Sequence, residues 1–222
     1  LWALWGRAGA GGAAFALRRR AARLLMGRED RLKQELASAF TTQTAAAPKE
    51  GGVIGGQYRL DSLLGKGTTG EVWAAFDATL KRTVAVKKMA LDLVADPEAR
   101  QRRLAEAHTA AGLQHPNIVA VFEVLDLPAG VFLVFEHVSG QPVRRLLEKN
   151  GPFAPARARQ ILEGVCAALE HAHSQGVTHR NLRTSNIMLT EDGTVRVLDF
   201  SVAAGAGDAS VDLRGLGTCL YE

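Results

Sequence analysis

The sequence predicts an α+β fold in which a β-rich part precedes an α-rich part. From Gln57 to about residue 138, short runs rich in β-branched and aromatic residues dominate, and one helical stretch, 97–113, interrupts them. After Gly140 the pattern becomes helical, and over 155–175 apolar residues recur along one helix face. With 222 residues, the chain is long enough for one large domain or two small ones.

The N-terminal region differs from the rest of the chain in charge and composition. Residues 1–50 have a net charge of +5, whereas residues 51–222 have a net charge of −1. We predict a basic helical arm over 1–40, a flexible Gly-rich linker over 41–56 and a folded domain over 57–222. A basic arm favours an acidic partner or an anionic lipid surface. We expect no nucleic-acid binding, because no basic face with base-reading side chains is visible.

Two interpretations of residues 1–17 stay open. This segment is apolar except for Arg7, and arginines occupy positions 18–20. A transmembrane helix needs about 20 apolar residues, so the segment could form only the end of a membrane span, with the arginines on the cytoplasmic side. It would then tether the domain to the cytoplasmic face of a membrane. The alternative is an Ala- and Arg-rich linker helix of a cytoplasmic protein.

A glycine-rich turn connects the first two predicted strands. The segment Gly65–Val72 (GKGTTGEV) follows the strand that starts at Tyr58. Glycines in this pattern let the backbone approach phosphate groups closely. A second hydrophobic run, 72–76, follows directly, whereas a dinucleotide-binding turn would continue into a helix. A β-hairpin therefore fits better, and Lys87 ends the Val-Ala-Val-Lys run of the next predicted strand.

Three further segments complete the set of motifs. The run Phe132–Val138 predicts the strand that leads from the β-rich part to the α-rich part, and two polar motifs lie beyond the helix at 155–175. These are His179–Asn186 (HRNLRTSN) and Asp199–Ser201 (DFS). Together with the two earlier motifs, they resemble the G-x-G-x-x-G-x-V, V-A-I-K, H-R-D-L-x-x-x-N and D-F-G motifs of bacterial, eukaryotic-type Ser/Thr protein kinases.

The resemblance implies a two-lobe kinase fold, with a β-rich lobe over 57–138 and a partial α-rich lobe over 139–222. The second lobe is shorter than in a complete kinase, so we expect a C-terminally truncated form. Residues 212–222 (DLRGLGTCLYE) resemble the start of the large helix behind the catalytic loop, with Asp212 bracing that loop. An alternative alignment, of 217–221 with the G-T-x-x-Y of an activation segment, explains fewer positions.

The resemblance also implies that the domain binds ATP and Mg²⁺. The implied nucleotide-binding positions are Gly65, Lys66, Gly67, Gly70, Val72, Ala85, Lys87, Phe135, Glu136, Val138 and Met188. In the family, the lysine of the V-A-I-K motif pairs with a helix carboxylate, here Glu106. Asn186 and Asp199 are the implied metal ligands.

The chain departs from the family pattern on the side of the protein substrate. The implied catalytic positions are Lys87, Glu106, Asn181 and Arg183. Asn181 stands where the family has the catalytic Asp, and an amide oxygen accepts a hydrogen bond but cannot take a proton. Loss of a general base typically costs about 10²–10⁴-fold in rate. Ser201 replaces the Gly of D-F-G, and only twelve residues separate Asp199 from Asp212, so we expect no ordinary activation segment.

Three functions stay open at this point. The favoured one is a kinase-family signalling domain that binds Mg-ATP but transfers phosphate weakly or not at all. The second is an active Ser/Thr protein kinase, supported by the retained lysine and metal ligands. The third is an interaction or scaffold module that needs no nucleotide. The protein substrate or partner is not identified by the sequence.

Overall fold

The computed structural model describes residues 48–90, 97–200 and 209–221. The predicted arm at 1–40 lies outside these residues, as does Ser201. Among the described residues, no helix is both long and apolar enough to cross a membrane.

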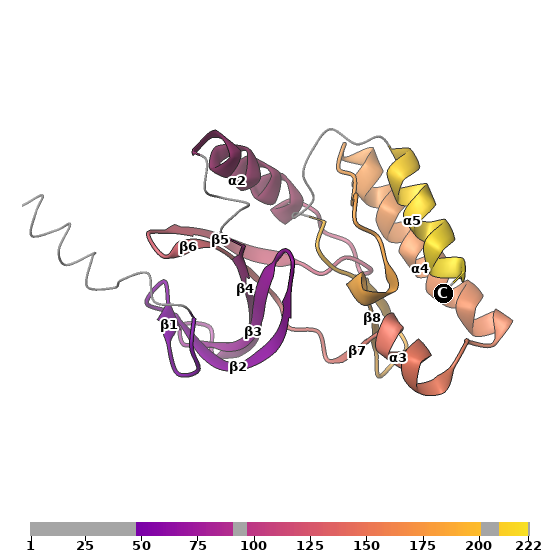
Figure 1. The fold of residues 1–222 in the computed structure, drawn as a ribbon, viewed down its shortest axis with the longest axis horizontal. Helices are drawn as coiled ribbons and strands as arrows, with labels where there is room; N and C mark the ends of the chain where they lie inside the picture. The colour runs from indigo at the N-terminus through magenta and orange to yellow at the C-terminus, as the bar shows by residue number, and fades with distance from the viewer. Residues whose placement is uncertain (1–47, 91–96, 201–208, 222) are drawn as a thin grey trace, which may run out of the picture. The chain divides into compact units, whose positions relative to one another are not determined.

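The first part of the described chain is a six-stranded antiparallel sheet with one helix on it (Figure 1). The strand order is β1-β2-β3-β4-β6-β5. The elements are β1 (Val53–Ile54), β2 (Tyr58–Gly67), β3 (Gly70–Asp77), β4 (Arg82–Met89), α2 (Pro97–Ala111), β5 (Val121–Leu127) and β6 (Gly130–Glu136). Helix α2 packs against the sheet at β5.

The start of the folded part corrects the predicted domain boundary. Val53 and Ile54, which the sequence analysis placed in the linker, pair with Arg59 and Tyr58 as strand β1. Ile54 also packs on the core beneath the sheet. An edge strand of two residues is too short to show the alternation that predicts a strand, and the glycines on either side of it favour a linker.

Strand β6, between β4 and β5, is buried on both faces of the sheet. Its residues alternate between two cores, because successive side chains of a strand point to opposite faces. Phe132 and Val134 join one core with Leu60. Val131, Leu133 and Phe135 join the other, which α2 covers through Ala107. The continuous apolar run of β6 therefore reflects burial on both faces.

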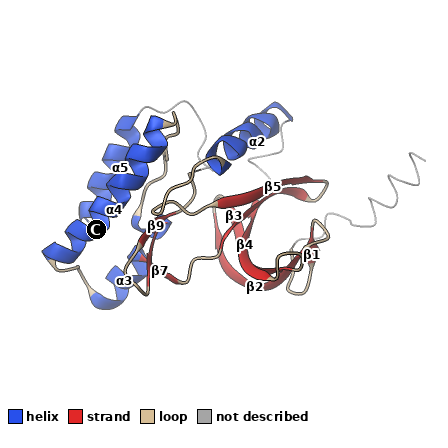
Figure 2. Ribbon diagram, turned by 180° about the vertical axis from the view of Figure 1, so that it is seen from behind, coloured by secondary structure: helices blue, strands red, loops and turns tan. Residues whose placement is uncertain are grey.

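The second part combines a small sheet with three helices (Figures 1 and 2). Strand β7 pairs with β8, and β8 with β9. The elements are β7 (Gly140–Pro142), α3 (Val143–Asn150), α4 (Pro155–Ser174), the 3₁₀ turn η2 (Thr184–Asn186), β8 (Ile187–Thr190), β9 (Val195–Val197) and α5 (Ala209–Tyr221). The predicted α+β fold with a β-rich part and an α-rich part is confirmed.

Helix α4 buries one apolar face in the core of this second part. The buried residues recur at helical spacing and are Ile161, Val165, Ala168, Leu169 and Ala172. They pack with residues of β8, β9 and the loop before β8. This face matches the period seen in the sequence.

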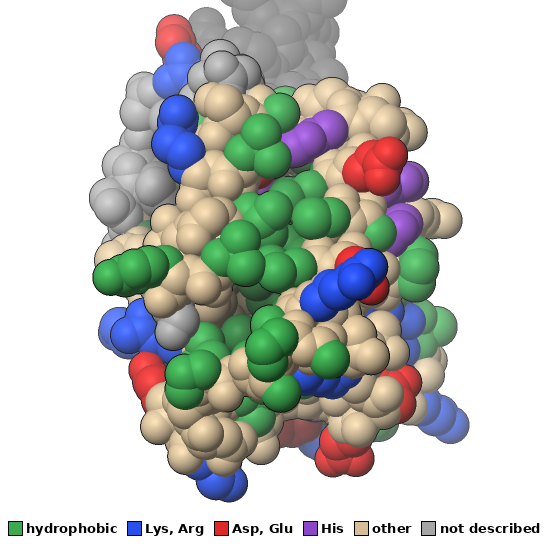
Figure 3. Space-filling model, turned by 90° about the vertical axis from the view of Figure 1, so that its right-hand side faces the viewer, with side chains coloured by type: hydrophobic (Ala, Val, Ile, Leu, Met, Phe, Trp, Pro, Cys, Tyr) green, Lys and Arg blue, Asp and Glu red, His purple; other side chains and the backbone are tan. Residues whose placement is uncertain are grey.

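An apolar surface lies over α3, α4 and α5. Figure 3 shows green side chains gathered around a hollow on this face. A pocket of about 130 Å³ is lined there by residues that include Leu147, Phe153 and Leu220. Leu213 and Tyr221 of α5 are exposed to solvent as well. Helix α5 is thus in contact with the core along only one side.

A close approach holds α5 against the loop that contains Leu182. A Cβ added to Gly215 would lie 2.9 Å from both Leu182 Cβ and Leu182 O, whereas one added to Gly217 would meet nothing within 4 Å. We expect Gly215→Ala to lower the free energy of unfolding by about 1–3 kcal/mol, because the packed loop must shift. Gly217→Ala in the same helix should raise it by up to about 1 kcal/mol. Urea unfolding of both variants checks this, and equal effects would contradict the close packing.

Candidate active site

A glycine-rich turn, which has few side chains, joins β2 and β3. Gly67 pairs with Gly70 across the hairpin, and Gly70 has φ +136, a conformation that favours glycine. A Cβ at Gly70 would lie 1.9 Å from Lys88 O, so no other residue fits there. Gly65 and Gly67 have open space around them. The turn therefore presents backbone to whatever lies beneath it, as the sequence predicts for a phosphate cover.

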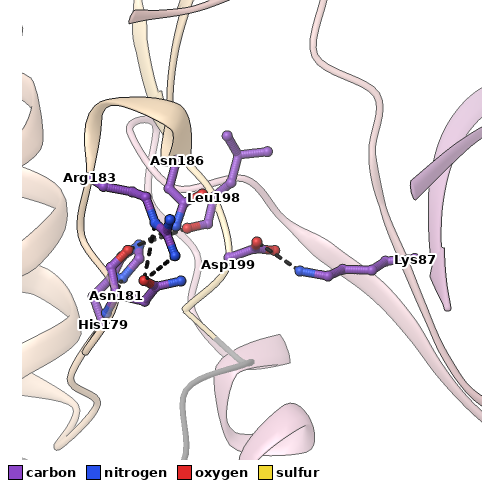
Figure 4. A network of polar contacts seen from close by, with 7 residues as sticks. All are labelled: Lys87, His179, Asn181, Arg183, Asn186, Leu198 and Asp199. Atoms are coloured by element: carbon purple, nitrogen blue, oxygen red, sulfur yellow. Dashed lines mark hydrogen bonds and ion pairs between the residues drawn. The ribbon is translucent and has the colours of Figure 1, made fainter. Parts of the chain in front are cut away.

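Lys87 of β4 is the central cation of the site. Its side chain is 3% exposed, and its Nζ lies 2.7 Å from Oδ2 of Asp199. Figure 4 shows the two side chains directed toward one another. The strand register places Lys87 opposite Val72 on one side and Leu133 on the other. An ammonium group this deeply buried requires an anionic partner, and Asp199 provides it.

The predicted pairing of Lys87 with Glu106 is not formed, which corrects the sequence analysis. In the described part of the chain, Glu106 Oε1 instead lies 3.5 Å from Nη1 of Arg180. Asp199 already neutralises Lys87, and Arg180 offers Glu106 a second cation. Lys87 and Glu106 are thus each paired with a residue that the sequence analysis did not assign to them.

The side-chain oxygen of Asn181 is already hydrogen-bonded to the guanidinium group of Arg183. Its Oδ1 accepts hydrogen bonds from Nη2 of Arg183 at 2.8 Å and from Nε at 3.2 Å (Figure 4). Nδ2 of Asn186 donates to the backbone O of Asn181 at 2.8 Å. The structure therefore brings together three of the predicted site residues in one short loop.

His179 connects this loop to the segment that carries Asp199. The N–H of Asn181 donates to His179 Nδ1 at 3.3 Å, and Nε2 of the same ring contacts Leu198 O at 2.7 Å. Because Nδ1 accepts, Nε2 must carry the proton, which defines a neutral imidazole. Burial lowers the pKa of His179 below its ordinary value, and the bond to Leu198 O only partly offsets this. The ring also packs on Phe200 with centroids 4.7 Å apart.

Asp212 braces the loop from behind, as the sequence analysis predicted. Its carboxylate is fully buried at the start of α5. Oδ2 accepts from the backbone N–H of His179 at 2.8 Å, and Oδ1 accepts from that of Arg180 at 2.6 Å. These bonds favour the alignment of 212–222 with the large helix over the alternative alignment of 217–221.

The end of β6 is held by a charge pair that the sequence did not indicate. The N–H of Glu136 donates to Ala120 O at 3.0 Å, so its backbone can offer a ligand only the carbonyl oxygen. The Glu136 side chain pairs with Arg196 of β9. Ala85 lies opposite the buried Phe135 across β4 and β6. The other predicted adenine-contacting residues, Val72, Val138 and Met188, are all half-buried.

Asn186 and Asp199 have the chemistry that magnesium needs. Hard cations of this kind take carboxylate and amide oxygen ligands. Asn186 bonds to the loop through Nδ2. In the described residues its Oδ1 accepts no hydrogen bond. Asp199 adopts φ +66, which directs its carboxylate to Lys87. No group of three or more His, Cys, Asp or Glu suited to a metal occurs elsewhere in the described chain.

Comparison with known proteins agrees with this geometry. A family model described as a protein kinase domain matches residues 58–221. The chain belongs to the protein kinase family. It is 39% identical over 162 residues to a probable serine/threonine-protein kinase, PknB, of Corynebacterium glutamicum, covering 71% of this chain and 25% of that protein. It is 36% identical over 182 residues to the serine/threonine-protein kinase PknA of Mycobacterium tuberculosis, covering 79% of this chain and 42% of that protein.

Solved structures show the same fold. The kinase domain of Mycobacterium tuberculosis PknI superimposes with a TM-score of 0.69 at 24% identity, covering 78% of this chain and 75% of that one. The chain spans about a quarter of the length of several curated relatives that it matches. These relatives establish a bacterial Ser/Thr kinase-family domain.

The neutral state of His179 makes the stability of this kinase-family domain depend on pH. Since burial lowers the pKa of His179 in the folded state, folding disfavours the imidazolium. The stabilisation is present above the unfolded pKa of about 6.5 and is lost as the pH falls through the lower folded value. We expect the free energy of unfolding to drop between about pH 7 and about pH 5. An NMR titration of the imidazole checks the cause, and a His179 pKa above about 6.5 would contradict it.

Proposed function

We propose that this kinase-family domain binds Mg-ATP and transfers phosphate weakly or not at all. The observation that carries the proposal is the contrast between two sets of residues. The buried Lys87–Asp199 pair and Oδ1 of Asn186, which no hydrogen bond engages within the described residues, retain the chemistry of a phosphate and metal site. Asn181, in contrast, offers an amide oxygen that Arg183 already engages.

The residues on the nucleotide side have distinct roles in this proposal. The glycine turn between β2 and β3 covers the phosphates with backbone, and Lys87 neutralises them. Asn186 and Asp199 would hold the metal ion, which neutralises phosphate charge when bound. Since Asp199 pairs with Lys87 in this structure, binding requires the lysine to turn from the carboxylate to the phosphates.

The substrate side explains why transfer is weak. A hydroxyl acceptor needs a group that takes its proton, and the amide at position 181 cannot do so. The family also requires the lysine–glutamate pair in place, whereas Glu106 lies on Arg180 here. Because phosphoryl transfer has a loose transition state, positioning alone supports slow residual turnover. An active Ser/Thr kinase is therefore the second candidate, supported by the retained Lys87, Asn186 and Asp199.

Thermal unfolding with and without Mg-ATP tests nucleotide binding. A ligand at about 100 times its dissociation constant stabilises a fold by about 2.7 kcal/mol, so we expect a clear rise in the unfolding midpoint. ATP with EDTA should give a smaller shift, because the two metal ligands then have no ion to hold. Asn186→Ala is the matched variant, since it removes a proposed metal ligand from a half-buried position without touching the buried Lys87–Asp199 pair. A folded native sample with no shift would leave only the nucleotide-independent scaffold.

A further inference from the structure

Two histidines stack where the loop after helix α2 meets helix α4. The ring of His115, in that loop, lies with its centroid 5.1 Å from that of His171 in α4, at an interplanar angle of 26°. Both residues are half-buried, and we call them the histidine pair. Two imidazolium rings at this distance would repel each other, so the stack favours at least one neutral ring.

A hydrogen bond defines the protonation state of the first ring. The backbone N–H of Asn117 donates to Nδ1 of His115 at 3.1 Å. Because Nδ1 accepts this bond, the ring proton lies on Nε2 and the imidazole is neutral. A second proton can be added only at Nδ1, where it removes the acceptor that Asn117 uses. Burial, and next the neighbouring His171, lower the pKa of His115 below its ordinary value, in agreement with the neutral form.

Helix α4 and the loop itself bring no carboxylate to the histidine pair. A Cβ added to Gly164 would lie 3.3 Å from Asn117 Nδ2, so the loop lies along the face of α4 that contains Gly164. The positions that follow on this face at helical spacing are Ala168 and His171. Residues 112–119 contain no charged side chain other than a titrating His115.

The other two elements next to the loop have their charges paired elsewhere. Arg196 of β9 donates to the backbone of this loop, at Pro116 O, over 3.0 Å, and its charge is paired with Glu136. In α2, Glu106 is paired with the catalytic loop, and the ring of His108 contacts the backbone of its own helix. Within the described residues, therefore, neither ring of the histidine pair forms an ion pair that would stabilise a proton.

The turn at Asn117 supports strand β9. Asn117 Nδ2 donates to Val195 O at 2.8 Å, and Asn117 O accepts from the N–H of Val197 at 2.8 Å. The N–H of Val119 donates to Val197 O at 2.9 Å. Two residues after Val197 comes Asp199, a predicted metal ligand. A change at this turn therefore reaches the strand that leads to the candidate site.

We propose that the histidine pair is an acid-sensitive contact, in which a proton on His115 releases the turn at Asn117 and loosens β9. The part that concerns Mg-ATP rests on the proposed function, whereas the part that concerns the turn does not. The stabilisation contributed by the neutral ring is present above the unfolded pKa of about 6.5. It is lost as the pH falls through the lower folded pKa of His115.

Three variants of the whole chain test this contact at about pH 7 and about pH 5.5. His115→Asn places an amide oxygen near the position of Nδ1, so it keeps an acceptor for Asn117 but cannot take the proton. His171→Phe keeps an aromatic partner for the stack and removes the second titrating ring. His108→Phe, which removes an exposed histidine of α2, is the control. Because His179 is present in every variant, its contribution to acid sensitivity is common to all of them.

Hydrogen exchange of the amides of Val119 and Val197, corrected for the intrinsic effect of pH, reports the turn. Loss of one hydrogen bond predicts a several-fold to roughly tenfold loss of protection in the native chain at the lower pH. His115→Asn should avoid most of this loss. NMR titration should show the pKa of His115 raised by about half a unit in His171→Phe, because the repulsion of a second charge is removed. His108→Phe should resemble the native chain in both measurements.

Titration with Mg-ATP at the same two pH values extends the test to the site. Comparing variants at equal pH removes the effect of protons that ATP itself binds. We expect the affinity of the native chain to fall several-fold further at the lower pH than that of His115→Asn. If the native chain binds no Mg-ATP, the proposed function fails, and exchange alone then decides whether the contact is acid-sensitive.

Each remaining outcome decides the proposal. Equal acid-induced losses of protection in the native chain and His115→Asn would overturn it, as would an unchanged titration of His115 in His171→Phe. If His115→Asn does not fold, His171→Phe takes its place. It should lose less protection in acid than the native chain, because its His115 has a pKa closer to the unfolded value.

Discussion

Replacing Asp199 with Asn is expected to destabilise the domain and to abolish its response to Mg-ATP. The change leaves the ammonium of Lys87 buried without an anion. Removing one member of a buried ion pair costs about 3–5 kcal/mol, and since Asp199 is 21% exposed we expect the lower end, about 3 kcal/mol. Asparagine tolerates the left-handed backbone that residue 199 adopts, so strain adds little. Urea unfolding measures the loss.

A double variant separates stability from binding. Adding Lys87→Met to Asp199→Asn removes the buried cation, and an apolar replacement of a buried pair is often neutral or stabilising. We expect the double variant to regain most of the lost free energy of unfolding. It should regain none of the Mg-ATP stabilisation, because it lacks both the cation proposed to bind phosphate and the carboxylate proposed to bind the metal ion. An Asp199→Asn variant as stable as the native chain would show that Lys87 does not depend on this carboxylate.

Restoring the carboxylate at position 181 is expected to raise phosphotransfer by about 10²–10⁴-fold, the usual contribution of a general base. Asn181→Asp keeps the size of the side chain, and its oxygens can still accept both bonds from Arg183. Transfer from radiolabelled ATP to the chain itself and to added Ser/Thr peptides measures the change.

Two control variants identify the source of any gain. Asn181→Ala removes the hydrogen-bond acceptor without adding a base, so it should show no gain. Asn181→Asp combined with Asn186→Ala should lose the gain if the reaction needs the metal ligand. Robust turnover by the native chain, unchanged in Asn181→Asp, would favour the active-kinase alternative and would show that position 181 does not limit the rate.

The motif residues could be predicted because each one belongs to a short pattern in the sequence. Gly70 is required by a single tight turn, and the pattern of glycines indicates that turn directly. Lys87 lies in β4 at the end of an apolar run, at a spacing set by the hairpin before it. Asp212 was recognised from a longer match whose small residue, Gly215, proves to lie against Leu182. In each case, a short stretch of sequence carries the recognisable pattern, even though Gly70 lies against Lys88 and Asp212 binds the backbone of His179.

The choice of partners could not be predicted in the same way. The resemblance to the family assigned Glu106 to Lys87 and gave Asp199 only as a metal ligand. The structure selects the second and gives Glu106 to Arg180. Which pair forms depends on where α2 lies relative to the catalytic loop, and on the desolvation of a buried ammonium, neither of which follows from spacing along the chain.

The sequence by itself determined the family and the two-part α+β fold, because these follow from periodicity and from short motifs. It also determined that position 181 lacks a carboxylate. Only the tertiary structure decided that Asn181 binds Arg183, that Lys87 pairs with Asp199 and that His171 stacks on His115. Those contacts join segments far apart in the chain or depend on side-chain direction. Their formation is decided by burial, which leaves each charged or polar group only the partners within a few ångströms.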